Sequence, residues 1–358
     1  MTLRAAIVGT GGIASEHART VRAAGNRVEL VAATDVDAGR LSGFAGTQSI
    51  ARTYPTLREL LEAERPDIVH VCTPPGTHAR LAIEALESGA AVFCEKPLCG
   101  SLAELDRIEA AEKRSGRWCA SVVQWRFGSA AKHLKRLAAS GIAGRALLAL
   151  CQTTWYRDAV YYSAPWRGRW DTELGGATMG QGIHAIDLTL WLLGDWESVD
   201  ATVATLDHEI AVEDVSLATV RFPGGALASV VNSVCSPHEE TRLRFDFQRA
   251  TFEVACLYAY GNADWRCTPA PDAMDVLEAW KAIPPDVPGV HSAQYDDFLD
   301  AISAGRRPPA SAADMRPTIE FITALYKSAA IRRPVERGSI QPGDPFYDHV
   351  AGTLVRGT

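Results

Sequence analysis

The sequence lacks the features that mark nucleic-acid-binding and membrane-spanning proteins. It has no basic excess, since 36 Lys and Arg residues stand against 43 Asp and Glu residues, for a formal net charge of −7. No block of Lys and Arg is long enough to replace the counterions of a phosphate backbone. No apolar run approaches the ~18 residues that a membrane span requires, and the apolar stretch at 3–8 is too short for a signal peptide. We therefore expect a cytoplasmic protein with no nucleic-acid or membrane partner.

The eight cysteines form no recognisable pattern. No CxxC pair is matched by a second pair, which is the spacing typical of structural zinc sites. Several lie in apolar, strand-like runs, such as Cys72 in IVHVCTP, and cysteine packs well as a small core residue. We interpret them as reduced core thiols and expect no metal site. The chain also shows no internal repeat, and its 358 residues are enough for two domains.

The first third of the chain alternates short apolar strands with amphipathic helices. Such an alternation implies right-handed crossovers and a parallel sheet with helices on both faces. It predicts an α/β, Rossmann-type dinucleotide-binding domain over residues 1–125. Ser101 with Glu104 three residues later predicts a capped start for the last of these helices. The expected strands are 3–9, 28–35, 67–74, 91–97 and 117–125, and the expected helices are 14–24, 37–44, 57–66, 77–90 and 101–116.

The pattern changes after residue 125. The later strands alternate apolar and polar residues, which predicts one large, mostly antiparallel sheet that is open on one face. Phe222-Pro223-Gly224-Gly225 indicates a hairpin turn. We therefore expect an α+β domain over 126–358 that binds the substrate, and a homodimer or homotetramer that covers the open face. The expected strands are 146–156, 198–206, 215–235 and 241–254, and the expected helices are 129–141, 292–304 and 315–331.

The most specific motif is GTGGIA at 9–14, a GxGxxA sequence that directly follows a predicted strand and directly precedes a predicted helix. Gly9 permits the tight turn, Gly11 lets a pyrophosphate approach the backbone, and Ala14 allows close packing of helix on strand. The free N–H groups and partial positive charge of the helix N-terminus favour the phosphates. The residues expected to line the pyrophosphate are Gly9, Gly11, Gly12 and Ile13.

Asp35 ends the second strand, 21 residues beyond Ala14. A carboxylate in that place can accept hydrogen bonds from the adenosine ribose hydroxyls and repels a 2′-phosphate. The pattern therefore favours NAD as the cofactor. NADP stays possible because Arg40 is close in sequence.

Glu95-Lys96-Pro97 closes a strand at the carboxyl edge of the predicted sheet, where ligands bind in doubly wound folds. Pro97 disfavours helix at Lys96, so the lysine ends an extended segment and can polarise a substrate oxygen beside the nicotinamide. The bond before Pro97 can be cis, and a surface Glu–Lys pair at a turn is the alternative. TPPGTH at 73–78 ends the preceding strand and can shield the cofactor, although a histidine at a helix start is more often structural. The further expected cofactor contacts are Thr73, Pro74, His78, Glu95, Lys96 and Gln124.

GIHAID at 182–187 opens an apolar helix that ends at Gly194. His184 and Asp187 are three residues apart and share one helical face. A polar pair at the start of so apolar a helix indicates a pocket, and histidine suits acid–base work because it titrates near neutral pH. A lone helix histidine is more often a structural hydrogen-bonding group. The assignment of His184 as catalytic therefore depends on its combination with Lys96 and the glycine motif.

Taken together, these motifs resemble those of the glucose–fructose oxidoreductase/inositol dehydrogenase (Gfo/Idh/MocA) family, and the resemblance covers nearly the whole chain. The family implies NAD(P)-dependent oxidation or reduction at a secondary alcohol carbon of a sugar, cyclitol or related compound. It also implies a catalytic lysine, matched by Lys96, and a catalytic histidine, matched by His184. The stretches that carry the resemblance are GTGGIA at 9–14, TPPGTH at 73–78, EKPL at 95–98, QWRF at 124–127, GGATMGQGIHAIDL at 175–188, QYDDFLDAISAGRRP at 294–308 and ITALYKSA at 322–329.

One position departs from the family pattern. Many members carry Asp four residues before the histidine, where this chain has Gly180, and Asp187 can compensate. The stretch 153–176 resembles the substrate loop of sugar-active members: its aromatics can stack on sugar rings and its arginines can bind hydroxyls or carboxylates. A surface loop held by its own aromatics is an equal alternative. The expected substrate contacts are Arg126, Tyr156, Arg157, Tyr162, Trp166, Arg167, His184 and Asp187.

We expect hydride to pass between the substrate carbon and the nicotinamide while His184 takes the hydroxyl proton and Lys96 hydrogen-bonds the same oxygen. Two alternatives remain. Some relatives cleave glycosides by transient NAD-dependent oxidation, and a non-catalytic dinucleotide-sensing regulator can have the same fold. The joint presence of Lys96 and His184 argues against the regulator.

Overall fold

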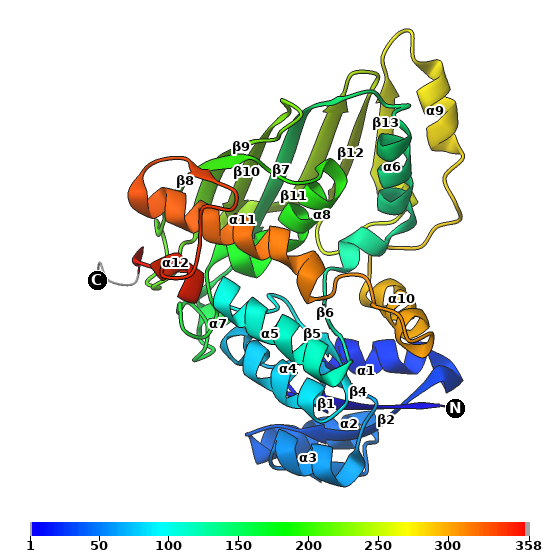
Figure 1. The fold of residues 1–358 in the computed structure, drawn as a ribbon, viewed down its shortest axis with the longest axis vertical. Coiled ribbons are helices and arrows are strands. Elements are labelled where there is room, and N and C mark those ends of the chain that lie inside the picture. Colours follow the sequence, from blue (N-terminus) through cyan, green and yellow to red (C-terminus); the bar gives the residue numbers. More distant parts are fainter. Residues whose placement is uncertain (1, 355–358) are drawn as a thin grey trace. The chain divides into compact units, whose positions relative to one another are not determined.

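The computed structural model describes residues 2–354. The chain forms two compact units, each of which is assembled from two stretches of sequence. The first unit comprises Met1–Val122 and Gln294–Arg316, and the second comprises Val123–Ala293 and Pro317–Thr358. Each unit has its own sheet (Figure 1).

The sheet of the first unit has six strands, all paired in parallel, in the order β3-β2-β1-β4-β5-β6. This is the doubly wound Rossmann order, in which the direction of strand addition reverses between β1 and β4. The strands are β1 (Leu3–Val8), β2 (Val28–Thr34), β3 (Arg52–Tyr54), β4 (Ile68–Val71), β5 (Ala91–Cys94) and β6 (Cys119–Ser121). The connecting helices are α1 (Ala14–Ala23), α2 (Ala38–Gln48), α3 (Leu57–Glu64), α4 (His78–Glu87) and α5 (Leu102–Ser115). The predicted fold of this domain is confirmed.

Local capping explains where α5 begins. The Ser101 side chain accepts a hydrogen bond from the Glu104 N–H at 3.0 Å, as expected for the start of α5. The Glu104 carboxylate returns a contact to the Gly100 N–H at 2.8 Å, one residue before the position of a standard capping box. The sequence therefore encodes the start of α5 in the five residues from Gly100 to Glu104.

One part of the predicted second domain belongs to the first unit. Helix α10 (His291–Ser303) buries Tyr295, Phe298 and Leu299 in a core cluster with residues of β1, β2, β4 and β5. The expected boundary at residue 125 is placed at Val122, and the segment Gln294–Arg316 returns to the first unit. The apolar stripe of this helix was visible in the sequence, but its packing partner was not.

The sheet of the second unit has eight strands in the order β13-β12-β11-β7-β10-β9-β8-β14. Every neighbouring pair is antiparallel except β7 and β10, so the predicted, mostly antiparallel sheet is confirmed. The strands are β7 (Ala146–Tyr156), β8 (Ser198–Ala204), β9 (Val215–Arg221), β10 (Leu227–Ser233), β11 (Cys235–Phe247), β12 (Ala250–Cys256), β13 (Trp265–Pro269) and β14 (Val335–Glu336).

Two long predicted strands are broken by turns. The stretch 215–235 folds into β9 and β10 around the expected turn, in which the Gly225 N–H bonds the Phe222 carbonyl at 2.9 Å. The stretch 241–254, predicted as one strand, contains the end of β11 and most of β12, with a reversal at Gln248 and Arg249. No glycine or proline marks this second turn, and therefore the alternation of apolar residues concealed it.

The helices of the second unit lie largely against one face of its sheet (Figure 1). Helix α8 packs on β7 and β11, and α6 packs on α8. The opposite face carries exposed leucines, among them Leu148, Leu150, Leu217 and Leu227. The helices are α6 (Ser129–Ser140), α7 (Ala159–Tyr162), α8 (Ile183–Leu193), α9 (Met274–Lys281), α11 (Ala312–Ile331) and α12 (Pro345–Asp348), of which α11 begins in the first unit and enters the second at Pro317. Over residues 2–354, no helix combines the length and apolarity needed to cross a membrane.

Candidate active site

The predicted pyrophosphate site has the backbone shape that the glycine motif implies. Gly9 has a φ of +87°, and a Cβ there would lie 2.8 Å from the Cys72 carbonyl, so only glycine fits. A Cβ at Gly11 or Gly12 would meet no described atom within 4 Å, which leaves this side of the loop open to a ligand. Among the described residues, no side chain at the N-cap position of α1 occupies its first N–H groups. These N–H groups and the helix dipole therefore suit a diphosphate.

Asp35 is held as an anion beside this loop. Its carboxylate accepts hydrogen bonds from the Thr10 N–H at 2.7 Å and hydroxyl at 2.9 Å, and from the Asp37 N–H at 2.8 Å. Arg40 also donates to it at 3.1 Å. Burial alone raises the pKa of Asp35, but the hydrogen bonds from Asp37, Thr10 and Arg40 outweigh it and lower the pKa below its usual value. An ionised acceptor at this strand end fits a ribose diol, and Arg40 lies next to it.

The TPPGTH and EKP loops are tied together by His78. One ring nitrogen lies 2.7 Å from the Pro97 carbonyl and the other lies 2.8 Å from the Thr73 carbonyl. Burial lowers the pKa of His78, against the effect of these two contacts. The Lys96–Pro97 bond is cis. The structure thus gives His78, expected as a cofactor contact, the role of joining the two loops that end β4 and β5.

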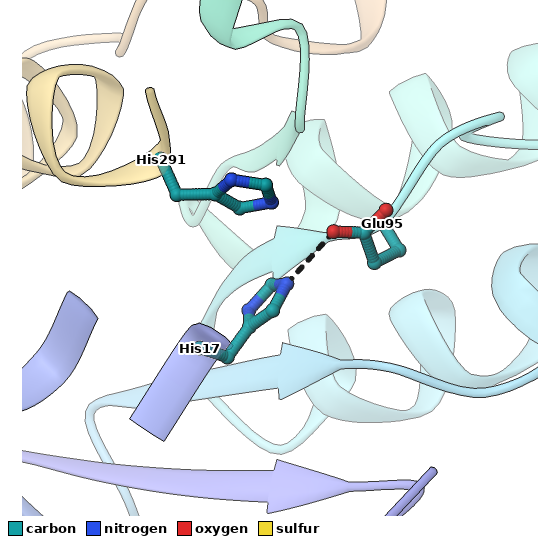
Figure 2. Close-up of side chains that lie close together, drawn as sticks. All are labelled: His17, Glu95 and His291. Atoms are coloured by element: carbon teal, nitrogen blue, oxygen red, sulfur yellow. Dashed lines mark hydrogen bonds and ion pairs between the residues drawn. The ribbon is translucent and has the colours of Figure 1, made fainter. Parts of the chain in front are cut away.

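A buried polar chain, which sequence reasoning missed, ends at Glu95. His17 Nε2 lies 2.9 Å from the Glu95 carboxylate (Figure 2), and its Nδ1 lies 2.9 Å from Nδ1 of His70. His70 Nε2 in turn lies 3.0 Å from the Tyr295 hydroxyl. One proton arrangement satisfies all three contacts: Tyr295 donates to His70, His70 donates to His17, and His17 donates to the Glu95 carboxyl group. Glu95 also accepts from the Lys96 N–H at 3.2 Å, so the chain anchors the residue before the predicted catalytic lysine.

In the second unit, the segment before His184 departs from a regular helix. Residues Ala177–Gly182 form π-helical turns that continue directly into α8, whose first turn carries His184. Such turns occur often at functional sites. The His184 ring stacks near Trp125, with ring centroids 6.0 Å apart. Gln124 and Trp125 lie in a short 3₁₀ turn, Gln124–Phe127, and not at the end of the predicted strand 117–125.

Arg126 and Asp187, both expected to contact substrate, bind each other. Arg126 Nε donates to the Asp187 carboxylate at 2.5 Å, and its terminal nitrogen donates to the other oxygen. The Thr318 hydroxyl donates to the same carboxylate at 2.8 Å. The Asp187 side chain is fully buried and that of Arg126 is only 10% exposed. This geometry supports a role in holding α8 against the QWRF segment, and it gives no support to the prediction that Asp187 contacts substrate.

The aromatic and arginine residues of the predicted substrate loop gather into one cluster. The Arg167 guanidinium lies 3.7 Å from the Tyr161 ring centroid and 4.1 Å from that of Trp166, and it pairs with Glu173 at 2.6 Å. Gln181, three residues before His184, donates to the Tyr161 hydroxyl at 2.8 Å. The structure therefore brings the predicted loop next to the His184 segment.

The remaining predicted substrate residues lie at the edge of the same cluster. The Arg157 guanidinium lies 4.8 Å from the Trp155 ring centroid and bonds Glu239 at 3.1 Å. The Tyr162 ring lies 4.8 Å from that of His208, and burial raises the pKa of its hydroxyl above the usual range. Tyr156 is exposed at the end of β7. All eight cysteines are free, as expected.

Comparison with known proteins shows the family. Residues 3–122 match the family model described as the oxidoreductase family, NAD-binding Rossmann fold, and residues 131–256 match that of the GFO/IDH/MocA C-terminal domain. The chain therefore belongs to the GFO/IDH/MocA oxidoreductase family, which confirms the resemblance seen in its motifs.

Individual relatives differ in how much of the chain they match. Inositol 2-dehydrogenase 3 of Saccharopolyspora erythraea is 34% identical over 57% of this chain, and the match spans only 57% of that protein. D-apiose dehydrogenase of Paraburkholderia graminis is 25% identical over 99% of this chain and 94% of its own length. The crystal structure of the WlbA dehydrogenase from Bordetella pertussis, in complex with NADH and UDP-GlcNAcA, is 26% identical with a TM-score of 0.82, covering 94% of this chain and 97% of that one.

Proposed function

We propose that this protein is an NAD-dependent dehydrogenase that oxidises a secondary alcohol carbon of a sugar, cyclitol or sugar derivative, or reduces the corresponding ketone. The observation that carries the proposal is the first unit's open glycine turn beside an ionised Asp35, with Lys96 just beyond β5 in the same parallel sheet. The named relatives act on polyols and sugars, which supports the same substrate class here.

We assign one residue of each unit a role in the reaction. When bound, the nicotinamide accepts or returns the hydride. We assign Lys96 to hydrogen-bond the substrate oxygen and stabilise its developing charge, and His184 to take the hydroxyl proton. Because this chain has Gly180 in place of the acid many members carry, His184 takes the proton without that carboxylate and acts together with Lys96 or water.

NAD is the proposed cofactor because the ionised Asp35 directly follows β2, where its carboxylate can accept hydrogen bonds from the adenosine ribose hydroxyls. A 2′-phosphate in its place would face this negative charge. Arg40, 3.1 Å from Asp35, is the neighbour that favours NADP. A comparison of both cofactors in the same assay decides between them.

The proposed substrate contacts come from the arginine–aromatic cluster next to the His184 segment. Aromatic faces and guanidinium groups bind the apolar and hydroxylated sides of a sugar ring. Within this set, Arg126 and Asp187 hold α8 through their mutual ion pair. The residues that remain as proposed contacts are Tyr156, Arg157, Tyr162, Trp166, Arg167 and His184.

We further propose a cytoplasmic homodimer or homotetramer assembled through the open sheet face. Leu148, Leu150, Leu217 and Leu227 project from one face of β7, β9 and β10 and are exposed in the single chain. Burying such a surface is favourable by about 25 cal/mol for each Å² of apolar area. The eight free cysteines are consistent with a reducing compartment. A monomer by analytical ultracentrifugation at micromolar concentration would contradict the oligomer.

The decisive experiment is a reduction assay with NAD and with NADP over inositols, aldoses and nucleotide sugars. We expect NAD-dependent turnover of at least one polyol, and a loss of about 10²- to 10⁴-fold in kcat for Lys96→Ala and His184→Ala with unchanged NAD affinity. The exposed Lys281→Ala is the matched control. Turnover that survives both substitutions would refute the assigned roles.

The same protein tests the alternatives. Hydrolysis of chromogenic glycosides without added NAD would favour a glycosidase. Tight NAD binding with no turnover of any tested compound would favour a regulator.

A further inference from the structure

Two adjacent buried acids, Glu213 and Asp214, precede strand β9 and have no place in the chemistry proposed above. The Glu213 residue is 2% exposed and Asp214 is fully buried. The Asp214 N–H bonds the Ala204 carbonyl at 3.0 Å, and the Val234 N–H bonds the Asp214 carbonyl at 2.9 Å. The backbone of the pair is therefore fixed to the ends of β8 and β10, while the two side chains bind different segments.

Glu213 holds the segment that leads into the His184 helix. Its carboxylate accepts hydrogen bonds from the Gly176 N–H and the Thr178 N–H, both at 2.9 Å. Its backbone carbonyl accepts from the Ala177 N–H at 3.0 Å, so one residue satisfies three consecutive N–H groups. The Tyr326 hydroxyl donates to the same carboxylate at 2.8 Å.

These contacts amount to a helix cap supplied from another part of the chain. The first N–H groups of a helix have no partner within the helix, and a negative charge near them is favourable. The two segments approach so closely that only glycine fits at residue 176, because a Cβ there would lie 1.7 Å from the Glu213 carbonyl oxygen. Burial raises the pKa of Glu213, against hydrogen bonds that favour the anion.

Asp214 holds a different segment, the loop at residues 206–208. Its carboxylate accepts from the N–H groups of Leu206 at 2.7 Å, Asp207 at 2.9 Å and His208 at 3.1 Å. These backbone bonds, together with the His208 side chain, lower the pKa of Asp214 although burial alone raises it.

The loop that Asp214 fixes supports the proposed substrate cluster. His208 Nε2 lies 2.7 Å from the Arg157 carbonyl, which can only accept, so this nitrogen carries a proton. The His208 ring also packs against the Tyr162 ring, with the two ring centroids 4.8 Å apart. Asp214 therefore acts on Arg157 and Tyr162 through His208.

We propose that Glu213 and Asp214 form a positioning pair, in which Glu213 fixes the helix start that carries His184 and Asp214 fixes the loop that supports Arg157 and Tyr162. The assignment of catalytic consequences rests on the function proposed above. Because the two residues are consecutive in the chain, one short stretch of fixed backbone positions His184 relative to the side chains that bind the sugar. The two side chains have different kinetic effects: the contacts of Glu213 affect kcat, and the contacts of Asp214 affect KM.

The test uses Glu213→Gln and Asp214→Asn in the 358-residue chain, with Glu278→Gln and Asp275→Asn as controls, since both side chains are more than half exposed on α9. In Glu213→Gln, an amide donor replaces an acceptor opposite a backbone N–H. Losing a hydrogen bond to a charged group corresponds to a fall of about 10- to 100-fold, expected here in kcat with unchanged NAD affinity. Asp214→Asn should raise KM by about 10-fold or more with a smaller change in kcat. The controls should change neither.

Amide hydrogen exchange gives a readout that does not depend on activity. Glu213→Gln should accelerate exchange at residues 176–178 and leave 206–208 unchanged, and Asp214→Asn should do the reverse. Should Glu213→Gln fold poorly, Tyr326→Phe removes one donor and keeps the carboxylate, and it should lower kcat by a smaller factor. A wild-type kcat in Glu213→Gln, equal effects of both variants on kcat and KM, or unchanged exchange would overturn the proposal. Wild-type protein without turnover overturns the proposed function instead, and the exchange data still decide the positioning roles.

Discussion

Removing one partner of the buried Arg126–Asp187 ion pair should destabilise the second unit far more than removing both. In Asp187→Leu, the guanidinium of Arg126 loses two hydrogen bonds while its side chain stays 90% buried, given its 10% exposure. An uncompensated buried charge of this kind destabilises by about 3–5 kcal/mol. The Thr318 hydroxyl loses its acceptor as well, which adds roughly 1 kcal/mol.

The double variant Arg126→Met/Asp187→Leu removes both charges and replaces them with apolar side chains of similar volume. Such replacements are often neutral or stabilising. We therefore expect the unfolding free energy of the double variant to lie within about 1 kcal/mol of that of wild type, including the hydrogen bond that Thr318 loses. Comparing the unfolding free energies of the double and single variants separates the net contribution of the ion pair from the cost of leaving one buried charge unpaired.

Urea unfolding followed by tryptophan fluorescence measures these differences, since Trp125 lies next to Arg126 in the chain. The exposed pair Arg249–Asp275, at 2.8 Å in the same unit, provides the matched control. Asp275→Leu should change the unfolding free energy by less than about 1 kcal/mol, as exposed pairs usually do. If Asp187→Leu is no worse than Asp275→Leu, or if the double variant is as unstable as the sum of the single ones, the argument from an unpaired buried charge is wrong.

Three further predictions concern single contacts. Because the pKa of Asp35 is lowered in the folded protein, the carboxylate adds stability above its unfolded value near 3.8, and this stability is lost as the pH falls through the lower folded value. The difference in unfolding free energy between wild type and Asp35→Asn, measured by denaturant titration, should therefore be constant near neutral pH and shrink below about pH 4; a difference that grows in acid would contradict the assignment. Tyr295→Phe removes the hydroxyl at His70 Nε2 and should destabilise by about 1 kcal/mol, whereas the exposed Tyr156→Phe should have no measurable effect on the unfolding midpoint. Gly176→Ala should prevent correct packing before α8 and lower the melting temperature, because its Cβ would lie 1.7 Å from the Glu213 carbonyl oxygen. In Gly180→Ala, the nearest atom to the new Cβ is 3.9 Å away, and the melting temperature should stay unchanged. If both variants are equally stable, residues 176 and 213 do not approach each other so closely.

The sequence was most informative where the deciding forces are local. The glycine motif, the strand–helix alternation and the Ser101 cap each depend on residues within one turn or one strand, and all appear in the structure. The short strand β3, between the expected helices 37–44 and 57–66, was not predicted. The hairpin at 222–225 was predicted because proline fixes a φ that suits turns and glycine adopts a positive φ without strain, as Gly225 does at +81°. The reversal at Gln248 and Arg249 was not, because it is made by residues without a turn preference.

The buried polar contacts could not be predicted from the sequence. His17 meets His70 across 53 residues and His70 meets Tyr295 across 225, so no periodicity connects them. The same holds for Glu213, whose carboxylate binds N–H groups 35 and 37 residues earlier in the chain. A histidine one turn into the helix after the glycine motif was the only local signal of the first network.

The sequence alone thus determined the class of fold, the dinucleotide turn and the family, because turn chemistry and hydrophobic period are encoded by near neighbours. Only the tertiary structure decided which unit α10 completes and that Arg126 pairs with Asp187. It also decided which acids hold the segments around His184. Those outcomes depend on burial, where an ionised or polar group must find a partner that distant parts of the chain supply.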